Sequence, residues 1–212
     1  MKKLIETLSN IWKIEELRQR ILLTLGLILI YRVGTYITLP GIDPSALATV
    51  KSQGSGGILG LVNLFAGGAF SRASVFALGI MPYISASIAM QLLTIVVPFF
   101  QKLQKEGESG RRLINQYTRW LTVAVTTFQG MGYVVYLTSV DSEAILIPST
   151  LFAISTVIVL TTGTLFVMWM GEKITDKGLG NGISLIIMIG ILARLPESLI
   201  QEATSRLQSG GL

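Results

Sequence analysis

The fold class is indicated most clearly by the stretch Phe76-Ala77-Leu78-Gly79-Ile80-Met81-Pro82-Tyr83-Ile84-Ser85-Ala86-Ser87-Ile88-Ala89-Met90-Gln91. It belongs to an apolar run of membrane length, yet it contains a glycine, a proline and small polar side chains. Pro82 lacks a backbone N–H and crowds the carbonyl four residues earlier, so the pattern predicts a helix that bends near Leu78. Hydroxyl and amide groups in hydrocarbon need hydrogen-bond partners or water, and Ser85, Ser87 and Gln91 bring such groups into this stretch. The stretch is therefore predicted to face protein or a pore on one side and lipid on the other.

The composition of the whole chain is that of a membrane protein. Half of the 212 residues are hydrophobic and 14% are charged, whereas soluble domains carry about 25% charged residues. The chain has no cysteine and no histidine, which excludes disulfides, thiolate or imidazole metal sites and catalysis by either side chain. We therefore expect no cofactor and no metal. The first apolar run has no small-residue cleavage site, so a cleaved signal peptide is not expected.

Apolar runs of sufficient length predict an all-α polytopic membrane protein with five transmembrane helices. The expected spans are residues 21–37, 73–97, 120–137, 145–170 and 183–195. Residues 1–20 are predicted to form a cytoplasmic amphipathic helix, and residues 196–212 an external tail. Lysine and arginine are concentrated before the first span, between the second and third, and between the fourth and fifth, which predicts a cytoplasmic N-terminus.

The first external loop contains an apolar segment that is too short and too rich in glycine to span a membrane. This segment, residues 58–72, has Gly60, Gly67 and Gly68 among its apolar residues. Apolar surface exposed to water is costly, so we expect a re-entrant segment or one that fills a cavity.

Several side-chain groups allow more than one interpretation. Ile80 and Ile84 share a helix face, as do Ile183 and Ile187, and such pairs serve either as ordinary packing residues or as a pore constriction. The intramembrane polar residues either hydrogen-bond between helices or line a wet pathway. The basic, glycine-broken loop 102–112 either sets orientation or docks a cytosolic partner. The glycine-rich segment 171–182 is predicted to be a tight turn, because it lacks the features of a phosphate loop.

Long motifs in the chain resemble the SecY family, the protein-conducting channels of bacterial Sec translocons. The resemblance runs in order over nearly the whole chain, and the motifs are long and specific. They are residues 63–65, 67–69 and 71–74, the stretch 76–91 quoted above, Gly107-Glu108-Ser109-Gly110-Arg111-Arg112, residues 168–169 and 171–172, and Gly178-Leu179-Gly180-Asn181-Gly182-Ile183-Ser184.

The resemblance implies a function and a set of site residues. SecY proteins pass unfolded polypeptides across the plasma membrane and release hydrophobic segments sideways into lipid. The positions that match their pore constriction are Ile80, Ile84, Ile183 and Ile187. Those that match the external plug are Leu61, Asn63, Leu64, Phe65, Gly67, Gly68 and Phe70. Those that match the lateral gate are Pro82, Ser85, Ser87 and Gln129, and those near the docking site of cytoplasmic partners are Arg111 and Arg112.

The resemblance also implies partners: SecE-type and SecG-type small membrane subunits, a SecA motor or a ribosome, signal peptides, nascent chains and the lipid bilayer. Family members have ten spans in two inverted-repeat halves, whereas this sequence stops after five expected spans. We therefore expect one half of a channel, which is not an enzyme and which needs a missing C-terminal half.

Two other classes remain open at this stage. Half of a secondary transporter would also have broken helices, but the expected spans contain no acidic residue. A membrane enzyme would need titratable groups that converge at one depth, and the sequence shows none.

Overall fold

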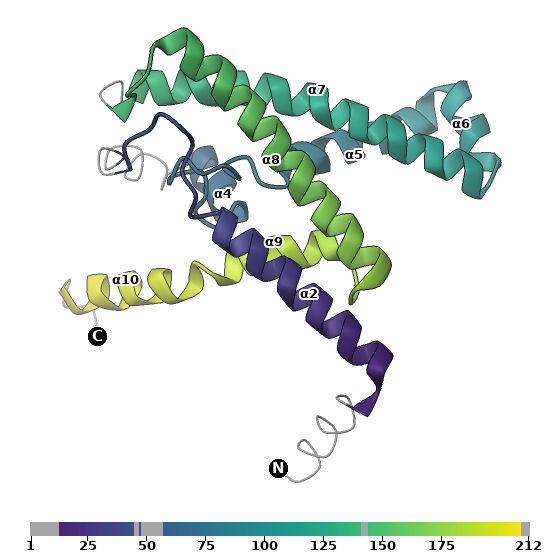
Figure 1. Ribbon diagram of the computed structural model, residues 1–212, viewed down its shortest axis with the longest axis horizontal. Helices are drawn as coiled ribbons and strands as arrows, with labels where there is room; N and C mark the ends of the chain where they lie inside the picture. The colour runs from purple at the N-terminus through teal and green to yellow at the C-terminus, as the bar shows by residue number, and fades with distance from the viewer. Residues whose placement is uncertain (1–12, 45–46, 48–56, 141–143, 209–212) are drawn as a thin grey trace.

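The computed structural model describes residues 13–44, 47, 57–140 and 144–208. Within these ranges the chain is helical, with no β-strand and only two isolated bridges, Thr38 with Ser74 and Ile42 with Ile145. The all-α expectation is therefore confirmed. The helices are α2 (Glu15–Gly34), α4 (Gly57–Phe65), α5 (Met81–Val96), α6 (Pro98–Lys105), α7 (Glu108–Val140), α8 (Ser149–Lys177), α9 (Gly182–Leu192) and α10 (Leu195–Gln208) (Figure 1).

Helices α7 and α8 are the longest elements, and the chain turns back between them at one end of the molecule (Figure 1). Helix α7 packs against α5, α6 and α8, while α2 and α9 pack against α8. Small residues at four-residue intervals let these helices approach closely. On α7 the buried stripe consists of Thr118, Thr122, Thr126 and Gly130, and on α5 of Pro82, Ala86, Met90 and Thr94.

The buried threonine hydroxyl groups of the α7 stripe all have hydrogen-bond partners. Thr118, Thr122 and Thr126 each donate a hydrogen bond of 2.6–2.9 Å to the carbonyl one turn earlier in the same helix. Their methyl groups are left to pack against neighbouring helices, so a polar residue type forms part of a dry interface.

The start of α5 differs from the sequence prediction. The helix begins at Met81, and residues 71–80 form turns, with Gly79 at a φ of +54°. Pro82 therefore lies in the first turn of α5. Backbone N–H groups in the first turn have no partner within the helix, so the missing N–H of proline costs no hydrogen bond there. The predicted bend near Leu78 is wrong, because the chain uses the proline to begin a helix rather than to kink one. The sharp break comes later, at Val97, where α5 and α6 meet at 95°.

The number of membrane spans stays a prediction. By length and composition, α8 is long and apolar enough to cross a membrane, and the bent pair of α5 and α6 is a second candidate. Helix α9 has 11 residues and ends before the expected limit at Leu195, where α10 begins with Pro196 in its first turn. The expected N-terminal helix lies mostly outside the described residues, and α2 already begins at Glu15.

Candidate functional site

Both isoleucine pairs lie against one hydrophobic cluster. Ile80 immediately precedes α5 and is buried, and Ile84 lies one turn further along that helix. Ile183 and Ile187 occupy the first two turns of α9 and, like Ile84, are partly buried. The buried members of the cluster come from α2, α8, α9 and the segment before α5: Tyr31, Phe76, Ile80, Val167, Met168, Met170, Ile174 and Ile186. The structure thus brings together two pairs that are about a hundred residues apart in the sequence.

The start of α9 is fixed by hydrogen bonds and by a close approach of backbones. The Asn181 side-chain oxygen accepts from the N–H groups of Ile183 at 3.1 Å and Ser184 at 3.2 Å, which caps the helix. A Cβ on Gly182 would lie 2.1 Å from the carbonyl oxygen of Gly171 on α8, so no other residue fits there. Gly180 has a φ of +66°, as a tight turn requires. The predicted turn is therefore confirmed for residues 178–181 only, because residues 171–177 are the last residues of α8.

The segment 58–72 contains α4, followed by a compact turn. Gly67 and Gly68, both at positive φ, end the helix. Asn63 is buried, and its side-chain oxygen accepts the N–H of Ser71 at 3.1 Å, while its carbonyl accepts the N–H of Gly68 at 2.8 Å. Among the expected plug residues, the structure buries Asn63, Gly67, Gly68 and Phe70, leaves Leu64 and Phe65 half-buried and leaves Leu61 exposed.

Two other helices hold the end of this segment. On α9, a Cβ at Gly190 would lie 2.7 Å from the carbonyl oxygen of Phe65, so the two backbones touch. On α7, the Tyr133 hydroxyl donates to the carbonyl of Phe70 at 2.7 Å, and the two rings meet edge to face at 4.8 Å. The segment is thus packed into the molecule rather than lying free in a loop, as the apolar composition predicted.

Two of the expected gate residues lie at one cavity. Ser85 of α5 and Gln129 of α7 line a cavity of about 260 Å³, whose wall also includes Val62 and Phe70 of the segment 58–72. Pro82 lies one turn before Ser85 and is buried. Ser87 is not at this cavity: it lines a second cavity of about 250 Å³ together with Gln91, Thr94 and Arg111.

The basic loop 102–112 is mostly helical. Its first residues end α6 and its last residues begin α7, with a break at Gly107, where φ is +77°. Arg111 and Arg112 are exposed, and Arg112 forms an ion pair of 2.8 Å with Glu108 one turn earlier. Both arginines remain available to solvent at one end of α7.

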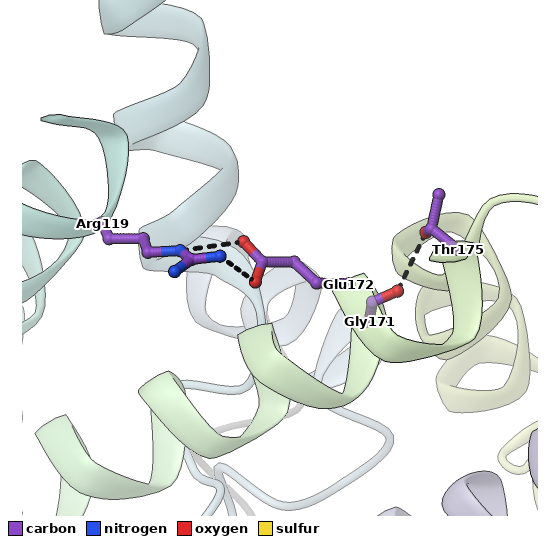
Figure 2. A network of polar contacts seen from close by, with 4 residues as sticks. All are labelled: Arg119, Gly171, Glu172 and Thr175. Atoms are coloured by element: carbon purple, nitrogen blue, oxygen red, sulfur yellow. Dashed lines mark hydrogen bonds and ion pairs between the residues drawn. The ribbon is translucent and has the colours of Figure 1, made fainter. Parts of the chain in front are cut away.

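An ion pair between α7 and α8 was not predicted. Arg119 donates from Nε to Glu172 Oε1 at 3.2 Å and from Nη2 to Oε2 at 2.7 Å (Figure 2). No local sequence pattern links these two residues, which lie 53 positions apart. Since the Arg119 side chain is 54% exposed, we expect the pair to contribute less than about 1 kcal/mol.

The ion pair borders a polar cavity of about 250 Å³ at the start of α9. Its lining includes Tyr83 of α5, Asn181 and Ile183, so it lies directly beside one of the two isoleucine pairs. Within the described part of the chain, no group of three or more aspartates or glutamates is placed to hold a metal ion.

Comparison with known proteins identifies a family. The SecY family model matches residues 74–211. The chain is 47% identical over 188 residues to a protein translocase subunit SecY from Vibrio cholerae, covering 89% of this chain and 42% of the relative. It is 49% identical over 186 residues to that of Escherichia coli K12, covering 87% of this chain and 42% of the relative. It is 47% identical over 203 residues to the protein translocase subunit SecY from Buchnera aphidicola of Schizaphis graminum, covering 94% of this chain and 46% of the relative.

These alignments cover less than half of each relative, so the chain corresponds to part of a SecY protein. The matched region includes α5, both isoleucine pairs and the turn before α9. On this evidence the chain belongs to the SecY family.

Proposed function

We propose that residues 1–212 form the N-terminal half of a protein-conducting channel in a bacterial plasma membrane. The channel passes unfolded secretory polypeptides across the membrane and releases apolar segments of membrane proteins into the lipid. The observation that carries this proposal is the meeting of both isoleucine pairs at one hydrophobic cluster, in a chain whose relatives are named protein translocase subunits.

Ile80, Ile84, Ile183 and Ile187 form half of the pore constriction in this proposal. A ring of branched aliphatic side chains closes around a passing chain without selecting any one sequence. It also resists ions, because an apolar constriction is unfavourable to wet. Residues 21–195 supply the membrane half-channel. The second half of the ring comes from a C-terminal half that corresponds to the part of the relatives beyond the aligned region.

The segment 58–72 acts as the plug. Its contact with Gly190 of α9, one turn beyond Ile187, supports a plug that covers the constriction from the external side. Hydrogen bonds at Asn63 and Phe70 and the burial of Ala66, Ala69 and Phe70 in a hydrophobic cluster hold it in this place, so these contacts must break when a substrate enters.

The lateral gate lies along α5 and α7. Ser85 and Gln129 share a cavity with two residues of the plug segment, so opening of this seam changes the surroundings of the plug at the same time. Pro82 starts the helix that moves, and Ser87, five residues further along α5, shares a cavity with Arg111.

Partners act at both surfaces. Arg111 and Arg112 project at the cytoplasmic end of α7, where a SecA motor or a ribosome docks and supplies the driving force. Small subunits of the SecE and SecG type surround the spans, which lie in the bilayer with the N-terminus cytoplasmic and residue 212 external. The exposed apolar faces of α2 and α8 supply the surface that such neighbours or lipid cover.

Reconstitution tests the proposal. In liposomes with the motor, a secretory substrate and the small subunits, a full-length channel that carries residues 1–212 as its N-terminal part is expected to translocate the substrate. Residues 1–212 reconstituted alone are expected to translocate none, because half a ring encloses no pore. Signal-dependent translocation by the isolated 212 residues, or none by the full-length channel, would contradict the proposal.

A further inference from the structure

The segment that contains α4 is followed by a stretch of backbone that is firmly paired. Residues 37–39, just after α2, run beside residues 73–75: Leu39 N–H donates to the carbonyl of Ala73 at 2.8 Å, and Val75 N–H donates to that of Ile37 at 2.9 Å. Ala73 and Ser74 are fully buried. Residues 73–75 are therefore fixed to the end of α2, and Arg72 is the last residue before this fixed stretch.

The Arg72 side chain reaches from this fixed stretch back to the turn that ends α4. Its Nη2 donates to the carbonyl of Gly67 at 2.9 Å, and its Nε donates to the carbonyl of Thr35 at 3.3 Å. The guanidinium group also lies over the Tyr36 ring, 4.4 Å from the ring centroid. One side chain thus joins the end of α4 to the end of α2.

The glycine turn is shaped to receive guanidinium groups. A Cβ on Gly68 would lie 3.1 Å from Nη2 of Arg72, and a Cβ on Gly67 would lie 2.9 Å from Nη1 of Arg32. Both glycines have positive φ, so backbone conformation and space together require glycine here. The turn lies against Arg72 closely enough for short, charge-assisted hydrogen bonding.

We propose that Arg72 is the latch that holds the plug segment in its resting place. This inference rests on the proposed function, in which α4 moves away when a substrate enters. Within the segment 58–72, α4 and the turn with Gly67 are the part that moves, whereas Arg72, its last residue, stays because residues 73–75 are paired with the residues just after α2. The bond between the Arg72 guanidinium and the Gly67 carbonyl must break before α4 leaves, and the Tyr36 ring keeps the guanidinium aimed at that carbonyl.

The test measures how often the segment leaves its place. Ala66, next to the turn, is buried, and the chain has no cysteine of its own, so Ala66→Cys reports displacement through its reaction with a membrane-impermeant maleimide. The measurement is made in the full-length, reconstituted channel with no substrate. Hydrogen bonds to charged groups predict that Arg72→Gln raises the labelling rate roughly ten- to hundredfold. Arg72→Lys is expected to lie in between, because an ammonium cannot bond both carbonyls as the guanidinium fork does.

The matched control is Arg20→Gln, which removes an arginine of α2 whose recorded ion pair with Glu16 is exposed. The control is expected to leave labelling unchanged, and Arg72→Gln is expected to leave the thermal unfolding midpoint nearly unchanged while labelling rises. If the Arg72→Gln channel does not accumulate, Tyr36→Leu replaces it in the same experiment, and we expect a smaller increase in the labelling rate.

Two results overturn the latch: labelling that stays at the wild-type rate in the Arg72 variants, or labelling that rises equally in the Arg20 control. Either result leaves the proposed function intact if the same preparations translocate substrate. If the wild-type channel translocates no substrate, that result contradicts the proposed function itself.

Discussion

Replacement of Gly163 by valine is expected to destabilise the fold by about 3 kcal/mol or more. Gly163 lies on α8 against the irregular segment before α5, and a Cβ there would lie 2.2 Å from the carbonyl oxygen of Val75. Backbone cannot yield by rotating a side chain, so the helix and the segment must move apart. Overpacking of this kind typically costs about 1–3 kcal/mol, and the loss of the backbone contact adds to it. The measurement is the unfolding midpoint of the purified channel in detergent.

The matched control for this prediction is Gly26→Val on α2. Gly26 is also helical, but it is exposed and a Cβ there has nothing within 4 Å. Helix propensities of glycine and valine differ by only a few tenths of a kcal/mol, so we expect stability to change by less than about 0.5 kcal/mol. Equal losses in the two variants would show that the contact between α8 and Val75 does not hold the segment before α5.

Conversion of three isoleucines of the proposed ring to serine is expected to open the resting channel to ions. The variant carries Ile84→Ser, Ile183→Ser and Ile187→Ser, and it leaves the more deeply buried Ile80 in place. Hydroxyl groups lower the cost of wetting the constriction, and a barrier lowered by about 1.4 kcal/mol already raises a rate tenfold. We therefore expect the ion conductance of the full-length channel without substrate to rise at least about tenfold in planar bilayers.

Three exposed isoleucines serve as the control for the ring: Ile30, Ile154 and Ile158, which are 46–59% exposed. Their conversion to serine adds the same number of hydroxyl groups on surfaces away from the isoleucine cluster, so conductance is expected to stay at the wild-type level. A leak of equal size in both triple variants would mean that the ring residues are ordinary packing residues.

The sequence predicted most of the helical architecture because its strongest signals are local. Apolar runs located α8 and most of α5, and the glycines before Asn181 located the turn into α9. The prediction that Pro82 bends a helix was wrong, because a proline in an apolar run is equally compatible with a helix kink and with the first turn of a helix. Contacts between distant segments favour the first-turn position. The backbone of Val75 lies against Gly163 of α8, within the irregular segment that precedes α5.

Contacts between distant segments had no signal in a single sequence. The Arg119–Glu172 pair joins two helices, and Tyr133 bonds a carbonyl 63 residues away, yet each residue has an ordinary local explanation. The isoleucine pairs were different, because a family resemblance singled them out beforehand. The structure then showed that both pairs share a cluster, while their role in a pore stays a prediction.

Cross-linking tests whether Ile84 lines the path of a passing polypeptide. The chain has no cysteine, so Ile84→Cys is a clean probe in a full-length channel that engages a stalled secretory substrate carrying one cysteine. The exposed Ile158 of α8, which belongs to neither hydrophobic cluster, provides the control as Ile158→Cys. We expect a disulfide at residue 84 that forms only with the stalled substrate, and little at residue 158. No cross-link at residue 84 together with a strong one at residue 158 would contradict this role of Ile84.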